Sequence, residues 1–149
     1  MPSQEALINT IRRQKAKYCR FVDTKNWDGF ASLFIERPSL HFYGPDGELL
    51  YEFNDRSEYV RAASSFLEGA HTIHQVHNDE IDIISDTEVR AIWSMEDYLF
   101  LAPGNDRPKS IHGYGHYHET WRLTDGNWCI TRIELRRTIL VTVPADSSH

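Results

Sequence analysis

Hydrophobic residues recur at helical spacing in the first half of the chain and alternate with polar residues over most of the second half. The first helix is predicted over residues 4–23, with Ser3 as its N-cap. The segment NWDGFASLF predicts a short second helix over 26–34, and NDRSEYVRAASSFLEG predicts a third over 54–69 that ends at Gly69. The apolar stripe of the first helix consists of Ile8, Ile11, Tyr18 or Cys19, and Val22.

Alternating segments follow these helices and predict a sheet. A hairpin is expected around Gly44–Gly47, and a run of strands begins at His71. The predicted strands are 39–43, 48–53, 71–77, 80–84, 88–101, 111–124 and 128–143. Long strands after N-terminal helices favour a single α+β domain over residues 1–149. We expect a cone-shaped, strongly curved, mixed but mainly antiparallel β-sheet that wraps the helices.

Alternation also assigns side chains to the two faces of the last strands. In 88–101 the odd positions form an apolar face that carries a single carboxylate, Asp97. His74 shares its face with small or apolar neighbours, whereas the other two histidines of HTIHQVHND point the opposite way. Tyr117 lies on the face opposite to three histidines of its own strand. The inward face therefore carries few polar groups, and these are the candidates for chemistry.

Composition excludes several classes of protein. The 149 residues carry a formal net charge of −6 without a run of lysine and arginine, which argues against a nucleic-acid partner. The two cysteines form no CxxC motif, so a disulfide scaffold is not expected. We find no signal peptide and no apolar run of transmembrane length. The chain is expected to be cytoplasmic and to bind no membrane.

The motifs of metal, nucleophilic and nucleotide chemistry are missing from the sequence. No HExxH pattern or cysteine cluster supports a metal site, and no GxSxG motif supports a serine nucleophile. No GxGxxG or Walker A motif supports a nucleotide. We therefore predict neither a metal ion nor a cofactor.

The remaining class of chemistry is acid–base catalysis, and for this class the sequence contains candidate residues. Asp23 ends the first helix, His74 and Asp97 face inward, and either Arg136 or Arg137 must do so as well. A histidine whose second ring nitrogen is held by an aspartate has a fixed tautomer and can act as a general base. On the residues alone, a core histidine and an unrelated surface aspartate remain an alternative explanation.

Three stretches of the chain resemble the SnoaL-like, nuclear-transport-factor-2-like superfamily. They are FVDTKNWDGFASLF, AHTIHQVHNDEIDIISDTEVRA and LTDGNWCITRIELRR, and the resemblance covers about residues 4–140. Its members include scytalone dehydratases, bile acid 7α-dehydratases and hexachlorocyclohexane dehydrochlorinases. These are eliminases without a cofactor, in which a histidine oriented by an aspartate removes a proton. The resemblance implies the same cone-shaped fold.

The resemblance also implies roles for particular residues. It places the catalytic pair on His74 and Asp23, assisted by Tyr18, Asp97 and Arg137. Two tyrosines and two tryptophans are expected to contact the substrate; the tyrosines follow from the resemblance and the tryptophans from a predicted apolar wall. These four residues are Tyr43, Tyr117, Trp27 and Trp93.

The expected function is a dehydratase that acts on a hydrophobic cyclic, polyketide-like or steroid-like hydroxy-carbonyl compound. An isomerase, a dehalogenating eliminase and a non-catalytic module that binds a hydrophobic ligand remain alternatives. The outer histidines, His112, His116 and His118, are expected in an interface, because members of the superfamily commonly form trimers or dimers through the sheet. We therefore expect a homo-oligomer.

Overall fold

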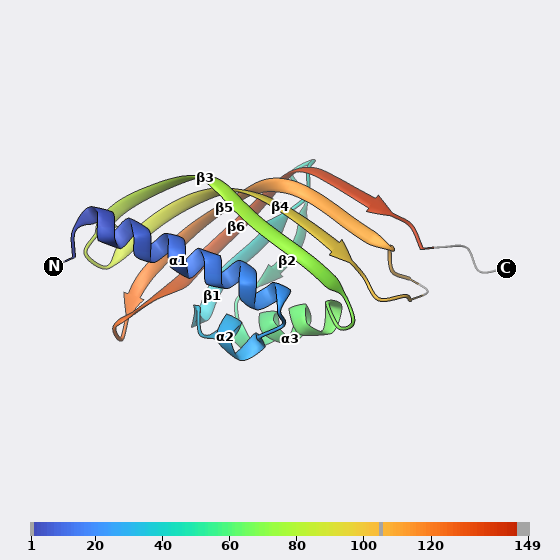
Figure 1. Ribbon diagram of the computed structural model, residues 1–149, viewed down its shortest axis with the longest axis horizontal. Coiled ribbons are helices and arrows are strands. Elements are labelled where there is room, and N and C mark those ends of the chain that lie inside the picture. The colour runs from blue at the N-terminus through green and yellow to red at the C-terminus, as the bar shows by residue number, and fades with distance from the viewer. Residues whose placement is uncertain (1, 105, 146–149) are drawn as a thin grey trace.

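The computed structural model describes residues 2–104 and 106–145 of the predicted domain; residues 1, 105 and 146–149 lie outside the described part. Three helices and six strands follow one another along the chain (Figure 1). Their bounds are α1 Gln4–Asp23, α2 Trp27–Ala31, β1 Phe34–Tyr43, β2 Leu49–Phe53, α3 Arg56–Phe66, β3 His71–Ser85, β4 Glu88–Phe100, β5 Ser110–Thr124 and β6 Asn127–Val143. No helix within the described ranges is long and apolar enough to span a membrane.

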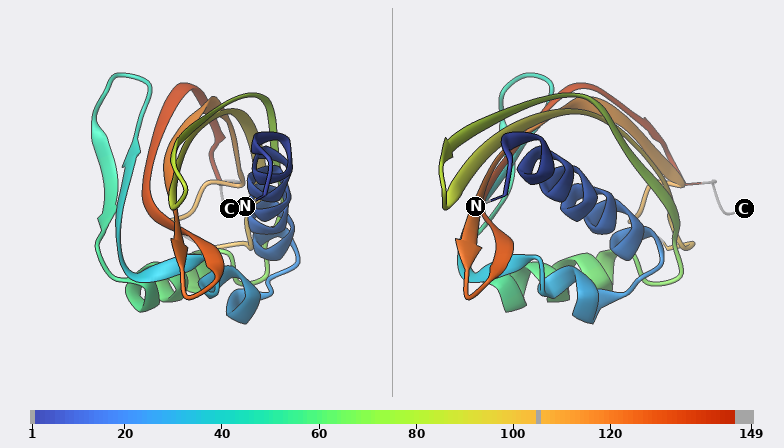
Figure 2. Two further views of the ribbon diagram at one scale, coloured as in Figure 1. Left: turned by 90° about the vertical axis from the view of Figure 1, so that its left-hand side faces the viewer. Right: turned by 60° about the vertical axis from the view of Figure 1, so that its left-hand side comes forward.

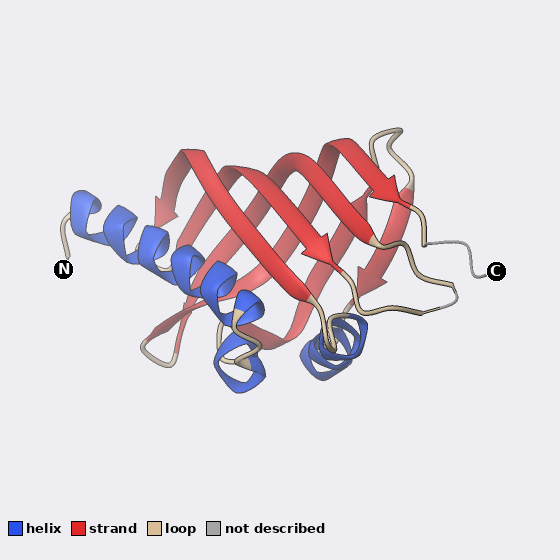
Figure 3. Ribbon diagram, turned by 45° about the vertical axis from the view of Figure 1, so that its right-hand side comes forward, coloured by secondary structure: helices blue, strands red, loops and turns tan. Residues whose placement is uncertain are grey.

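The six strands form one sheet in the order β2-β1-β6-β5-β4-β3. The pairing of β1 with β6 is parallel and the other pairings are antiparallel, so the sheet is mixed. The sheet arches around α1, while α2 and α3 lie below that helix at the open side of the cone (Figures 2 and 3). The predicted α+β cone is confirmed. It is an open sheet with edges at β2 and β3, not a closed barrel.

The first helix lies in the hollow of the sheet because one of its stripes is buried. Ser3 caps the helix by accepting a hydrogen bond from the backbone N–H of Ala6 at 3.1 Å, as predicted. Its buried positions are Leu7, Ile11, Lys15, Tyr18, Cys19 and Val22. This stripe includes a lysine that the apolar pattern omitted. The predicted faces of the long strands are confirmed, since buried and more exposed residues alternate along β4 and β5.

The third helix is shorter than predicted, Arg56–Phe66 with Leu67 as its C-cap, and two further boundaries differ from the predictions for identifiable reasons. The second helix stops at Ala31, and β1 begins at Phe34, because Phe34 pairs with Ile130 of β6. The two strands predicted at 71–77 and 80–84 form one strand, β3, with a bulge between His77 and Glu80. At the bulge Asn78 has a positive φ of 51°.

Candidate active site

The centre of the site is a pair made by the last residue of α1 and the start of β3. The Nδ1 of His74 lies 2.7 Å from Oδ1 of Asp23, and a carboxylate can only accept at this contact. The backbone N–H of His74 donates to Oδ2 of the same carboxylate at 2.9 Å, and the Thr72 hydroxyl donates to Oδ1 at 2.8 Å. Asp23 therefore holds the ring with its proton on Nδ1 and leaves Nε2 free to accept one.

The free nitrogen of His74 faces a second carboxylate. Nε2 lies 4.0 Å from Oδ2 of Asp97, the residue opposite His74 in the β3–β4 register. The guanidinium of Arg137 donates to both oxygens of Asp97 at 2.8 Å. Burial lowers the pKa of Arg137, but the hydrogen bonds and the charge of Asp97 outweigh this effect, so the pKa is raised. The buried Asp97 is thus paired with a permanent cation.

A glycine of β5 allows this ion pair to form. Gly113 is the β5 partner of Asp97, and the guanidinium of Arg137 crosses directly over it. A Cβ atom at Gly113 would lie 2.0 Å from Nη1 of Arg137 and 2.7 Å from Oδ1 of Asp97. Any side chain would therefore displace the pair. Glycine inside a strand often marks such a close approach.

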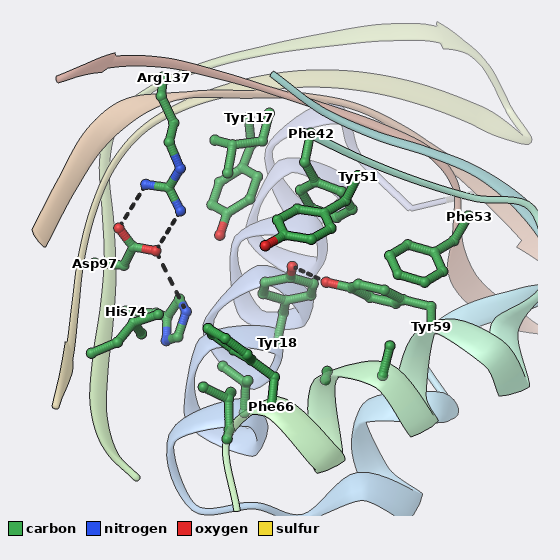
Figure 4. Close-up of a pocket in the computed structure, with 16 residues that line it drawn as sticks. Tyr18, Phe42, Tyr51, Phe53, Tyr59, Phe66, His74, Asp97, Tyr117 and Arg137 are labelled. Carbon is green, nitrogen blue, oxygen red and sulfur yellow. Dashed lines mark hydrogen bonds and ion pairs between the residues drawn. The ribbon is translucent and has the colours of Figure 1, made fainter. Parts of the chain in front are cut away.

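These polar groups open into a cavity of about 360 Å³ between the sheet, α1 and α3. In Figure 4, His74, Asp97 and Arg137 stand on one side, and aromatic rings from α1, β1, β2 and α3 stand on the other. Most of the lining is apolar, with four tyrosines as the further polar groups. The aromatic residues of the lining are Tyr18, Phe42, Tyr51, Phe53, Tyr59, Phe66 and Tyr117. The cavity suits a flat hydrophobic molecule with a polar end.

Three of the tyrosines are held as neutral phenols. Burial raises the pKa of Tyr18 and of Tyr117 well above the ordinary value, and burial raises the pKa of Tyr59 to about 12. The hydroxyls of Tyr18 and Tyr59 lie 3.3 Å apart and share a hydrogen bond. The hydroxyl of Tyr117 points into the cavity (Figure 4). Neutral phenols can donate hydrogen bonds to a negative oxygen on a ligand.

The structure brings most of the predicted site residues together. His74, Tyr18, Asp97, Arg137 and Tyr117 all line the cavity. Asp23 lies behind His74, where it borders a second, shallower hollow between α1 and β3 that His74 also reaches. Asp23 can therefore orient His74. Of the two candidate arginines, Arg137 is the one that faces the cavity. Arg136 binds Glu134 and stacks over Tyr43 outside the cavity.

Three residues predicted to contact a substrate, Tyr43, Trp93 and Trp27, lie outside the cavity. Phe42 faces the cavity, so the adjacent Tyr43 points to the other side of β1 and stacks against His41. Trp93 lies on the same face as Asp97 but four residues along the strand, about 13 Å deeper in the cone. Trp27 packs edge-to-face on Phe30, with ring centroids 5.8 Å apart, and borders a hollow beside α3.

The pattern of the sequence did not single out several functional residues. Tyr51 and Phe66 line the cavity from β2 and α3, next to Phe53 and Tyr59 of the same two elements. Gly113 was missed too, although two glycines inside one strand, in HGYGH, are an available signal. Lys15 follows Ile11 by four positions on the buried stripe, and this spacing could have marked it as an inward lysine.

The other described histidines lie on the outer face of the sheet or at its edge. His112, for example, binds Glu96 at 2.7 Å and stacks on Tyr98 with centroids 4.4 Å apart. Large apolar side chains are also exposed on β3 to β6, namely Ile73, Ile84, Phe100, Tyr114, Leu123, Ile139, Val141 and Val143. The expected homo-oligomer stays a prediction. Within residues 2–104 and 106–145, no three His, Cys, Asp or Glu side chains are grouped to hold a metal ion.

Comparison with known proteins identifies the family. The model of the SnoaL-like domain matches residues 6–134 of the chain. A protein of Gibberella zeae (strain ATCC MYA-4620 / CBS 123657 / FGSC 9075 / NRRL 31084 / PH-1), named Probable cyclase FGR4, is 30% identical over 135 residues. The match covers 85% of this chain and 88% of that protein.

Solved structures share the fold at low sequence identity. A crystal structure from Novosphingobium aromaticivorans DSM 12444, provisionally named a scytalone dehydratase, is 23% identical with a TM-score of 0.74, and 95% of each chain is covered. The hexachlorocyclohexane dehydrochlorinase LinA-type3 of Novosphingobium barchaimii LL02 is 16% identical with a TM-score of 0.75, covering 94% of this chain and 92% of that one. With the family model matching most of its length, the chain belongs to the SnoaL-like domain family.

Proposed function

We propose that the chain is a lyase that removes water from a hydrophobic cyclic hydroxy-carbonyl compound by acid–base catalysis on His74. The observation that carries this proposal is the geometry of His74, whose Nδ1 is bound to Asp23 while Nε2 faces an aromatic cavity. A relative named as a cyclase and structural neighbours named as a dehydratase and a dehydrochlorinase support chemistry on a small molecule.

In the proposed reaction, Nε2 of His74 takes a proton from the carbon next to the substrate carbonyl. The electron pair of that C–H bond forms an enolate, and Asp23 stabilises the imidazolium through Nδ1–H. The enolate then expels the hydroxyl group from the next carbon, and that oxygen takes the proton from the imidazolium and leaves as water. The products are a conjugated enone and neutral His74, so the cycle closes without another reactant.

The remaining polar groups have supporting roles. The hydroxyls of Tyr117 and of the Tyr18–Tyr59 pair donate to the enolate oxygen, which carries the charge that develops in the reaction. Asp97, held by Arg137, contacts the substrate hydroxyl near Nε2 of His74. The apolar lining excludes water and favours a substrate of one to three rings, given a cavity of about 360 Å³.

A panel of β-hydroxy ketones with one to three rings tests the proposal, with absorbance of the conjugated product as the signal. We expect turnover by the wild-type protein, and His74→Ala to lower it about 100- to 10,000-fold, because the general base is lost. Asp23→Asn, which keeps the shape but not the charge, is expected to lower turnover in the same direction. His77→Ala is the matched control, because His77 lies on the exposed side of the same strand.

The outcomes separate the alternatives. Wild-type turnover in both His74→Ala and Asp23→Asn would contradict the proposal. Binding of the panel compounds without any turnover indicates a binding module. Exchange or relocation of the substrate proton without loss of water, followed in deuterium oxide by NMR, indicates an isomerase. Release of chloride from halogenated analogues alone indicates a dehalogenating eliminase.

A further inference from the structure

A second buried ion pair lies deeper in the cone and does not line the cavity. The ammonium of Lys15 on α1 forms a short contact with Oε2 of Glu119 on β5. Both side chains are 0% exposed. Lys15 replaces an apolar residue in the middle of the buried stripe, between Ile11 and Tyr18. A charge in this position needs an explanation, because it loses its hydration on folding.

The carboxylate of this pair is fully bound. Its other oxygen, Oε1, accepts hydrogen bonds from the indole N–H of Trp93 at 2.7 Å and from that of Trp121 at 2.9 Å. Trp93 thus has a partner that explains its burial away from the cavity. The two indoles and Lys15 hold Glu119 in one position, and Glu119 in turn holds the ammonium in one position.

The ammonium lies against two rings of the cavity wall. Nζ of Lys15 is 3.6 Å from the ring centroid of Tyr18 and 3.6 Å from that of Tyr117. The two rings are themselves in edge-to-face contact, with centroids 5.8 Å apart. Both tyrosines line the cavity, and Lys15 touches them from behind. Only the aromatic rings of Tyr18 and Tyr117 therefore separate the ammonium group from a ligand in the cavity.

Stability alone does not account for this arrangement. A buried ion pair seldom stabilises a fold more than well-packed apolar residues of similar size would. A cation on the face of a phenol ring, however, fixes the ring and draws electron density away from its hydroxyl group. Such a hydroxyl is a better hydrogen-bond donor to a negative oxygen.

We propose that Lys15, held by Glu119, is a positioning residue that fixes Tyr18 and Tyr117 and strengthens their hydroxyls as donors to an oxyanion in the cavity. The inference rests on the proposed function, in which an enolate oxygen develops at that place. Nζ of Lys15 lies over the faces of both rings, 3.6 Å from each centroid, so its positive charge acts on the two phenols at short range. The site should therefore favour a phenolate or enolate over its neutral counterpart.

The test uses binding of 4-nitrophenol, whose ionised and neutral forms differ in absorbance, at a pH where the free probe is half ionised. The variant Lys15→Met/Glu119→Gln removes one positive and one negative charge, so the net charge of the protein is unchanged. We expect the affinity for 4-nitrophenolate to fall about tenfold. The affinity for 4-nitrotoluene, a neutral probe of similar shape, should stay within about twofold.

A matched control makes the same exchange of residue types elsewhere on α1. Lys17→Met/Glu5→Gln alters residues outside the cavity and should leave the affinities for both probes unchanged. Equal affinities of wild type and Lys15→Met/Glu119→Gln for nitrophenolate would overturn the proposal. A parallel loss of affinity for both probes would also overturn it, since that result indicates a purely structural role.

A second variant provides a test in case Lys15→Met/Glu119→Gln does not fold. Tyr117→Phe keeps the ion pair and removes only one of the hydroxyls, and it should weaken binding of 4-nitrophenolate but not of 4-nitrotoluene. An unchanged preference for nitrophenolate in this variant would count against the proposal. The measurement needs no turnover. Failure of the wild-type protein to convert the hydroxy-ketone panel is therefore a separate result, which contradicts the proposed function and leaves the probe experiment interpretable.

Discussion

Two buried pairs of a carboxylate with a lysine or arginine, both within the described residues, differ in what they can reach. Asp97 and Arg137 meet at the cavity wall, where the carboxylate lies 4.0 Å from the free nitrogen of His74. Lys15 and Glu119 meet behind the wall, and only aromatic rings separate their cation from the cavity. Both pairs connect charges on different elements of the fold. One joins two strands and the other joins α1 to the sheet.

The difference shows how access determines the role of a buried charge. Asp97 can touch a substrate, and its partner Arg137 keeps it in place beside His74. Glu119 is surrounded by its three donors and cannot touch a ligand. Its pair can influence chemistry only through the orientation and polarity of Tyr18 and Tyr117. Substitutions at the first pair should therefore have the larger effects.

The largest effect is expected from Arg137→Met. The change leaves Asp97, whose side chain is 4% exposed, without its cation in the interior. Removing one partner of a buried pair costs about 3–5 kcal/mol, so the free energy of unfolding in urea should fall by this amount. Arg136→Met is the control, because the Arg136 side chain is 52% exposed on the opposite side of the strand. This substitution should lower the free energy of unfolding by less than about 1 kcal/mol. Equal losses in the two variants would contradict the assignment of Arg137 to the interior.

Gly113→Ala should disturb the same pair without removing a charge. Its Cβ would lie 2.0 Å from Nη1 of Arg137, so the guanidinium must move off Asp97. We expect a loss of about 1–3 kcal/mol in unfolding free energy, as for other overpacked sites, together with lower turnover. Gly104→Ala in the β4–β5 loop serves as the comparison, since its new methyl group would meet only the flexible side chain of Arg107. Full turnover in Gly113→Ala would show that the pair is not required in this position.

A smaller effect concerns a buried thiol and three buried phenols in the interior of the cone. Burial raises the pKa of Cys19 from 9.0 to about 11 and that of Tyr59 from 10.0 to about 12, and Tyr18 and Tyr117 shift in the same direction. Above pH 9 the unfolded chain loses these protons first, so it binds fewer protons than the folded chain. Stability is therefore complete below pH 9 and falls as the pH rises towards 12.

Tyr59→Phe tests this pH dependence. Each such group contributes a slope of about 1.4 kcal/mol per pH unit between its two pKa values. The urea midpoint of the wild-type protein, measured between pH 8 and pH 11, should fall steeply above pH 9. The variant should lose stability less steeply above pH 10, because one buried phenol is missing. Parallel pH profiles of the two proteins would contradict the burial of a titrating group at residue 59.

Much of the fold follows from periodicity, and the failures have local causes. Alternation placed Asp97 and His74 on inward faces correctly, because a side chain in a regular strand has only two directions. Tyr43 was assigned to the substrate by the resemblance and not by alternation, and it lies on the other side of β1 from the cavity, next to an irregularity between Phe42 and Tyr43 in the pairing with β2. The break predicted between residues 77 and 80 is a bulge within a single strand, β3. Bulges depend on the partner strand, which a local pattern does not contain.

Single residues that stand out in the pattern were predicted, and the His74–Asp23 pair was predicted from the resemblance, but the Lys15–Glu119 pair was missed. Asp97 is the single carboxylate on the inward face of its own strand, so it could be recognised without its partner. Lys15 and Glu119 each occupied an inward position in the sequence, yet 104 residues separate them, and their pairing was not apparent. The choice between Arg136 and Arg137 depended on the register of β6, which shifts between Tyr114 and Gly115 of β5.

By itself the sequence determined the α+β class, the order of elements and the inward direction of His74 and Asp97, because these depend on spacing along the chain. Only the tertiary structure decided that Asp23 binds Nδ1 of His74, that Arg137 crosses Gly113 to reach Asp97, and that Lys15 supports two tyrosines from behind. These contacts join residues far apart in sequence. They depend on the path that each strand takes around α1, and the pattern predicted that the sheet is strongly curved but not which side chains this curvature brings together.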